Sequence, residues 1–164
     1  MKKIELFFCS LGLWITLGAC GNDGEVTKKD LEKPTITTEG VVAEPLNCSQ
    51  YLQGDTIRLC YVLKDNIELG SYNVEIHNNF DHHSHSTDAG ECELDSKKEA
   101  NSHVWIYNKD FKIPTGSTTF VADERIPIPE HAQAGDYHFM IRFTDKAGHQ
   151  EIKAVSIKII EKKD

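Results

Sequence analysis

Histidines crowd one short stretch of this sequence. Four of the eight histidines lie within nine residues, at His77, His82, His83 and His85. Neutral imidazole is a good ligand for zinc, copper and nickel, and clustered ligands lower the entropic cost of assembling a site. Asp81 lies in the same stretch, where it could bind the ion or orient a histidine from behind. The segment therefore predicts a divalent transition-metal site, with zinc or copper as the ion.

The spacing of these histidines matches no enzyme signature. The sequence has no His-Glu-x-x-His motif, no paired zinc-finger cysteines, no nucleophile elbow and no phosphate loop. We therefore expect a protein that is not an enzyme. The alternative for the histidine segment is a solvated loop that titrates near neutral pH and has no other role.

The elements that must position these side chains are strands. From Pro34 onward the hydrophobic period is two, and turn residues break the alternating runs at intervals typical of an all-β sandwich. We expect about seven strands, including short ones over 104–107, 111–113 and 118–127 and a closing one over 153–160. Three runs direct alternate side chains to the core: Ile57, Leu59, Tyr61 and Leu63; Tyr72, Val74 and Ile76; and Tyr137, Phe139, Ile141 and Phe143.

Two phrases flank the late strand, Ala134-Gly135-Asp136-Tyr137 before it and Asp145-Lys146-Ala147-Gly148 after it. With the opening residues 33–36, they resemble bacterial immunoglobulin-like and cadherin-like modules. The resemblance implies a sandwich in which the strands carrying His77 and His138 are neighbours in one sheet. Both histidines have outward parity, so their imidazoles would share one face near the histidine segment. His103 could approach the same cluster or lie on the surface.

The cysteines leave the pairing open. Three of them, Cys48, Cys60 and Cys92, fall in the predicted domain, an odd number in a compartment where disulfides form. We favour Cys48 with Cys92, because both lie outside the regular strands, and this leaves Cys60 as a small strand residue. In the alternative, Cys92 is a thiolate ligand for the metal, since it follows the histidine segment by only a few residues.

The first 19 residues predict a secretory signal. Lys2 and Lys3 precede a mostly apolar run from Ile4 to Leu17, which is too short to span a bilayer comfortably. The run ends in Leu17-Gly18-Ala19-Cys20, which resembles the lipobox at which bacteria acylate a cysteine and cleave the bond before it. The resemblance implies a protein held to a membrane by a lipid on Cys20.

The polar residues 20–33 predict a flexible tether, and residues 34–164 then form the immunoglobulin-like domain. No aspartate directly follows Cys20, whereas the commonest sorting scheme retains lipoproteins in the inner membrane by an aspartate there. This implies the outer membrane, and Asp23 and Glu25 resemble acidic tags for export to the cell surface. The formal net charge of −8 argues against nucleic acid as a partner.

The lipobox, the sandwich pattern and the segment 76–86 together resemble a family of bacterial lipoproteins catalogued as a domain of unknown function. The resemblance implies a sandwich on the outer envelope and no established activity.

Two functions follow as hypotheses. The first is an envelope lipoprotein that captures, buffers or hands over zinc or copper. The second is an adhesion or assembly module that binds a glycan or an envelope protein, which exposed Trp105 and Tyr107 would favour. The candidate ligands for the first are His77, Asp81, His82, His83, His85, His103 and His138.

Overall fold

The computed structural model describes residues 29–84 and 92–163. The predicted signal peptide, Cys20, most of the tether and His85 lie outside the described residues. No helix in the described ranges is long and apolar enough to cross a membrane.

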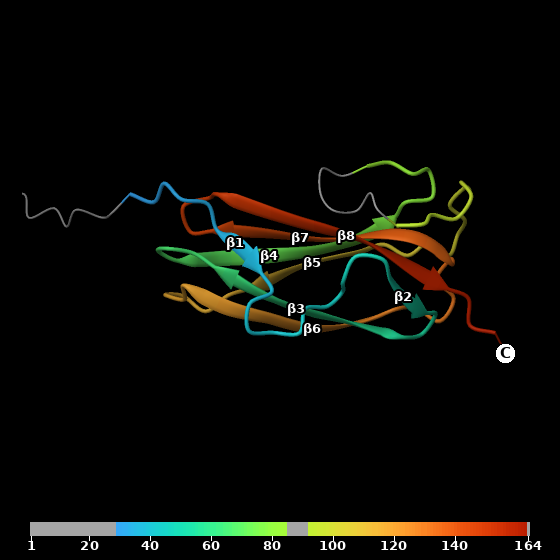
Figure 1. Cartoon of the computed structure of the whole chain (residues 1–164), viewed down its shortest axis with the longest axis horizontal. Helices are drawn as coiled ribbons and strands as arrows, with labels where there is room; N and C mark the ends of the chain where they lie inside the picture. Colours follow the sequence, from blue (N-terminus) through green and yellow to red (C-terminus); the bar gives the residue numbers. More distant parts are fainter. Residues whose placement is uncertain (1–28, 85–91, 164) are drawn as a thin grey trace, which may run out of the picture.

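The described secondary structure consists of eight strands in two sheets, with no helix (Figure 1). One sheet has the order β1-β3-β6 and the other β2-β8-β7-β4-β5. All neighbours are antiparallel except β2, which runs parallel to β8. The strands are β1 Thr35–Thr37, β2 Ser49–Leu52, β3 Thr56–Lys64, β4 Leu69–Asn78, β5 Tyr107–Lys112, β6 Thr119–Pro127, β7 Gly135–Asp145 and β8 Gln150–Ile160.

This arrangement confirms the predicted all-β sandwich. In immunoglobulin-like folds strands B and E pair in one sheet, and strands C, F and G form the other. β3 and β6 occupy the B and E places here, and β4, β7 and β8 occupy those of C, F and G. Near the start of β7, the Tyr137 hydroxyl donates a 2.7 Å hydrogen bond to the carbonyl of Gln133, as in the tyrosine corner of such sandwiches.

The core lies between the sheets and is built by the inward sets that the alternation predicted. All eleven of these side chains are at most 2% exposed and belong to one cluster. Cys60 and Val62 are also buried, at 1% and 4%, although they have outward parity on β3. Burying this apolar surface supplies the main stabilisation of the sandwich.

The expected strands over 104–107 and 111–113 form a single strand, β5, which starts at Tyr107. Val104 lies in a turn before it, where its N–H bonds to the carbonyl of Asn101. A long connection, residues 79–106, joins β4 to β5, and the structure describes 79–84 and 92–106 of it.

Candidate metal centre

Two histidines face one another across neighbouring strands. His77 near the end of β4 is directly opposite His138 near the start of β7. Their ring centroids are 5.6 Å apart with nearly perpendicular planes, at 88°. Both have outward parity, yet His138 is only 1% exposed and His77 is half-buried. Two imidazoles are thus held on a rigid sheet, which is the neighbour relation expected from the sequence.

A tight turn brings a third histidine over this pair. The N–H of His82 bonds to the carbonyl of Asn79, so the chain reverses directly after β4. His82 has a φ of 60°, a left-handed conformation that histidine adopts more readily than most residues. The reversal returns His83 to the sheet, and its ring lies 5.4 Å from His77 and 5.0 Å from His138.

The three imidazoles offer nitrogen atoms at distances that suit a metal ion. The Nε2 atoms of His77 and His83 are 3.3 Å apart. Two nitrogens bound tetrahedrally to zinc at about 2.05 Å would be roughly 3.3 Å from one another. One ligand atom of each histidine lies within 4.8 Å of the other two, so a small movement of the third ring would complete a three-histidine set.

Two carboxylates lie close to the Nδ1 atoms of His77 and His83. His83 donates from Nδ1 to Asp81 Oδ1 at 2.6 Å, and Glu75 Oε1 lies 3.1 Å from His77 Nδ1. The hydrogen bond from His83 lowers the pKa of Asp81 below its ordinary value, so this carboxylate is ionised at neutral pH. A carboxylate bonded to Nδ1 fixes the tautomer in which Nε2 carries the lone pair that binds an ion, and Asp81 does this for His83.

Glu75 is the member of this group that the sequence analysis did not include among the candidate site residues. It lies two residues before His77 on β4, and positions two apart on a strand share a face. The strand period therefore held enough information to find it.

The structure separates the other sequence candidates from this cluster. His82 turns away, and its Nε2 lies 2.9 Å from the carbonyl oxygen of Asp95. His103 is exposed and is not part of the cluster. The turn that brings His83 to the sheet directs His82 away from the cluster, and His103 also lies outside it. Neither is therefore in position to bind with the other three.

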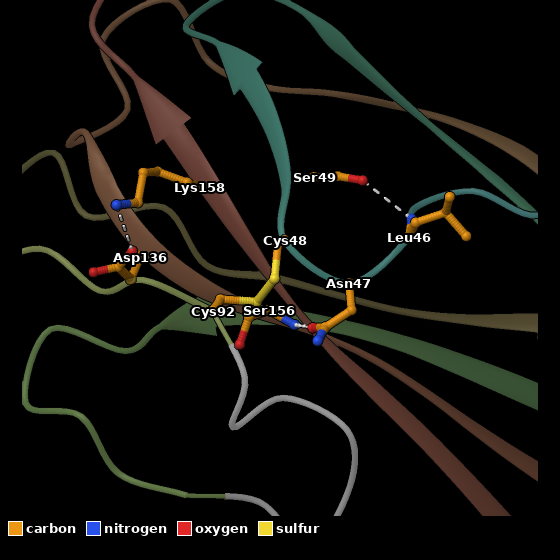
Figure 2. The surroundings of a disulfide bond; sticks show 8 residues. All are labelled: Leu46, Asn47, Cys48, Ser49, Cys92, Asp136, Ser156 and Lys158. Carbon is orange, nitrogen blue, oxygen red and sulfur yellow. Dashed lines mark hydrogen bonds and ion pairs between the residues drawn. A yellow bond between two sulfur atoms is a disulfide. The ribbon is translucent and has the colours of Figure 1, made fainter.

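Cys92 is bonded to Cys48 in a disulfide, so the alternative in which Cys92 is a thiolate ligand is wrong. Figure 2 shows this disulfide beside β8, where Ser156 lies. Cys60 is a buried free cysteine.

The aromatic residues that would have favoured an adhesion surface lie largely inside the protein. Trp105 is 7% exposed and belongs to the core cluster, and Tyr107 is half-buried against it. The ring of Trp105 lies 6.3 Å from those of both Tyr107 and Tyr137. The adhesion hypothesis thereby loses its main support.

A second group of possible metal ligands in the described ranges consists of Asp30, Asp145 and His149. Asp145 accepts hydrogen bonds from both the backbone N–H and Nδ1 of His149, at 2.8 and 2.9 Å. These contacts close the turn between β7 and β8, so this pair already has a structural role.

The fold and the cluster define a class: an immunoglobulin-like β-sandwich that carries three converging histidines on one outer face. The chain belongs to the family described as "Domain of unknown function (DUF4625)", whose model matches residues 18–160. No curated protein matches the chain.

Two solved structures are similar in part. One is Spo0M, a sporulation control protein from Bacillus subtilis, at 12% identity and a TM-score of 0.39 over 77% of this chain and 48% of that one. The other is a DUF4466 family protein from Parabacteroides merdae, at 16% identity and a TM-score of 0.38 over 79% of this chain and 46% of that one. The chain spans about half the length of each, and at this level of similarity neither informs its function.

Proposed function

We propose that this protein binds a divalent transition-metal ion, zinc or copper, through His77, His83 and His138, and that it does so without catalysing a reaction. The observation that carries the proposal is the 3.3 Å separation of the Nε2 atoms of His77 and His83. That separation matches two ligands of one tetrahedral ion.

The chemistry of the ligands supports an exchangeable ion. Three neutral imidazoles suit zinc and copper better than calcium or magnesium, which prefer oxygen. Three protein ligands leave a fourth position open, unlike the four-ligand sets of structural zinc sites. His83, on the connection, is about one third exposed, at 36% of its side chain. An ion could therefore enter and leave from the side of His83, as capture or transfer of a metal requires.

We further propose that the protein works at the cell envelope, anchored to the outer membrane by a lipid on Cys20. The signal and lipobox pattern of residues 1–20 supports this location. A tethered binder with an open site could buffer zinc or copper or deliver it to another envelope protein.

Calorimetric titration of zinc and copper into the purified full-length chain tests the metal site. We expect one ion per chain, with affinity lowered at least 100-fold in His83→Ala. The matched control is His103→Ala, which removes an exposed histidine outside the cluster and should leave affinity within twofold of the wild type. Equal losses in both variants, or unchanged binding in His83→Ala, would overturn the proposal.

A further inference from the structure

The disulfide between Cys48 and Cys92 lies in the same row of the sheet as the histidine cluster. His77 on β4 is opposite His138 on β7, and His138 is opposite Ser156 on β8. The N–H of Cys48 then bonds to the carbonyl of Ser156 at 2.8 Å. Since neighbouring strands are about 4.8 Å apart, the backbone of Cys48 is roughly 10 Å from that of His138.

This disulfide is open to attack by a thiol. Cys48 is exposed and Cys92 is partly exposed. Both line a cavity of about 140 Å³ together with Ser156 and Lys158. Figure 2 shows the sulfur atoms at the side of β8, with Asp136 and Lys158 nearby. A small thiol, or a cysteine presented by another protein, can therefore reach the bond without unfolding of the sandwich.

The backbone at Cys48 is also strained. Its φ of 65° lies in the left-handed region, which is unfavourable for a side chain other than glycine and is seldom adopted by cysteine. The disulfide and the hydrogen bond to Ser156 hold it there. Exposed disulfides exchange with thiols more readily than buried ones.

The disulfide lies close to the contact that holds His82. Cys92 is nine residues after His83. Three residues further on, the carbonyl oxygen of Asp95 lies 2.9 Å from Nε2 of His82. Besides the disulfide, Asp95 is held by its N–H to Asp136 Oδ2 at 2.8 Å and by an ion pair with Lys158 at 2.7 Å. Asp136 is buried, so the hydrogen bond to its carboxylate persists after reduction as a noncovalent contact. Without the disulfide, the segment that fixes His82, and with it the direction of His83, has a weaker hold on the sheet.

We propose that the Cys48–Cys92 disulfide is a reducible site at which an envelope dithiol loosens residues 92–95, and with them the turn at His82, and so lowers the metal affinity of the His77, His83 and His138 cluster. The inference rests on the metal binding proposed above and adds its regulation. It predicts tight binding in the oxidised protein and release of the ion under reducing conditions.

The chemical step balances as follows. A thiolate of the dithiol attacks the Cys48 sulfur, the bond to Cys92 breaks, and Cys92 leaves as a thiolate. The second thiol of the reductant then attacks the mixed disulfide and releases Cys48. Two electrons pass from the dithiol to the protein disulfide, and the two protons of the dithiol are taken up by Cys48 and Cys92.

The expected change in affinity follows from the fraction of molecules with His83 in place. If reduction lowers that fraction to about one in ten, the apparent dissociation constant rises about tenfold. His77 and His138 stay on their strands, so a residual two-histidine site remains.

The test compares zinc titrations of the full-length chain, oxidised or reduced with a phosphine that is removed before the titration. We expect about tenfold weaker binding after reduction. A Cys48→Ser/Cys92→Ser variant should bind zinc as weakly as the reduced protein, and the reductant should not change its affinity. Cys60→Ser, which keeps the disulfide, should behave as the wild type. Incubation of the native protein with a millimolar dithiol, followed by thiol counting, should show two new thiols without denaturant.

The outcomes separate the two proposals. Equal affinity before and after reduction, stronger binding after reduction, or a disulfide that resists the dithiol would overturn the redox inference and leave the metal site intact. Loss of the dispersed amide resonances of the sheets on reduction would also overturn it, because the effect would then be unfolding. Absence of zinc binding by the oxidised protein would overturn both.

Discussion

His77 and His138 occupy directly opposed positions on two antiparallel strands, and only His138 is fully covered. The sheet therefore fixes two of the three proposed ligands before any ion binds. His83 reaches the pair from the connection beyond β4 and completes the set. A site of this kind divides its ligands into a rigid pair and one that can move.

This division predicts different effects of removing each ligand. His138→Ala should abolish tight zinc binding and also lower the free energy of unfolding by about 1–3 kcal/mol, because it empties a buried position. His83→Ala should abolish tight binding but change stability by less than about 0.5 kcal/mol, since its side chain is partly exposed. Urea denaturation of both variants without metal measures the difference. Equal destabilisation would contradict the rigid and mobile assignment.

The carboxylates behind the histidines should set metal affinity without binding the ion. In Asp81→Asn, the Nδ1 of His83 loses its charged acceptor, and we expect zinc affinity to fall about 10-fold to 100-fold. Glu75→Gln should act in the same direction through His77.

Glu99→Gln is the matched control, because it neutralises an exposed acid of the same connection outside the histidine cluster. It should keep wild-type affinity in the same calorimetric titration. A similar loss in this control would mean that overall negative charge, rather than hydrogen bonding to the imidazoles, attracts the ion.

Strand parity predicted that His77 and His138 share one face, whereas His83 was predicted only as one of several candidates in the histidine segment. His77 and His138 could be paired because strand parity and sandwich topology together place them on one face. The choice between His82 and His83 depended on a turn whose third residue after Asn79 has a φ of 60°. Parity does not extend through such a turn, so the histidine segment alone could not say which side chains converge.

A glycine at the start of β7 holds the connection close to the sheet. Gly135 has a φ of 135°, and a Cβ added there would lie 2.8 Å from the Phe80 ring and 2.6 Å from Lys98 Nζ. Gly135→Ala should therefore lower the free energy of unfolding by about 2–4 kcal/mol, from strain plus crowding. Gly116 has a φ of 80°, and a Cβ added there would have no atom within 4 Å. Gly116→Ala therefore measures the backbone strain alone, at about 1–2 kcal/mol. Urea denaturation compares them, and equal losses would show that crowding against Phe80 is unimportant.

The fold followed from the sequence more completely than the site did. The alternating runs identified the inward side chains of β3, β4 and β7, because one buried face imposes a period of two. The sequence did not predict β2. This strand has only four residues, and they pair in parallel with β8, which lies far away in the chain. Val104 to Ile106 was expected in a strand but lies before β5, where Trp105 and Val104 pack on the core and Ile106 is exposed.

The lipid anchor gives a prediction that is independent of the metal. Cys20→Ser should abolish incorporation of a labelled fatty acid into the protein in growing cells and release it from the membrane fraction. Cys9→Ser is the control, because Cys9 lies in the predicted signal and should not affect labelling. Labelling that survives in Cys20→Ser would refute the lipobox assignment.

Stability at alkaline pH should depend on a buried tyrosine. Burial raises the pKa of Tyr61 to about 12, above its ordinary value of 10.0. The folded state thus favours the protonated phenol, and this stabilisation is complete below about pH 10 and lost as the pH rises toward 12.

Tyr61→Phe should lower the free energy of unfolding by about 1–3 kcal/mol at pH 7, because Tyr61 donates a hydrogen bond to the carbonyl of Pro45. In urea denaturation between pH 9 and 11, the free energy of unfolding of the variant should also fall less steeply than that of the wild type. Part of the decline should remain in the variant, since burial raises the pKa of Tyr51 to about 12 as well. Identical slopes for the two proteins would show that ionisation of Tyr61 does not drive alkaline unfolding.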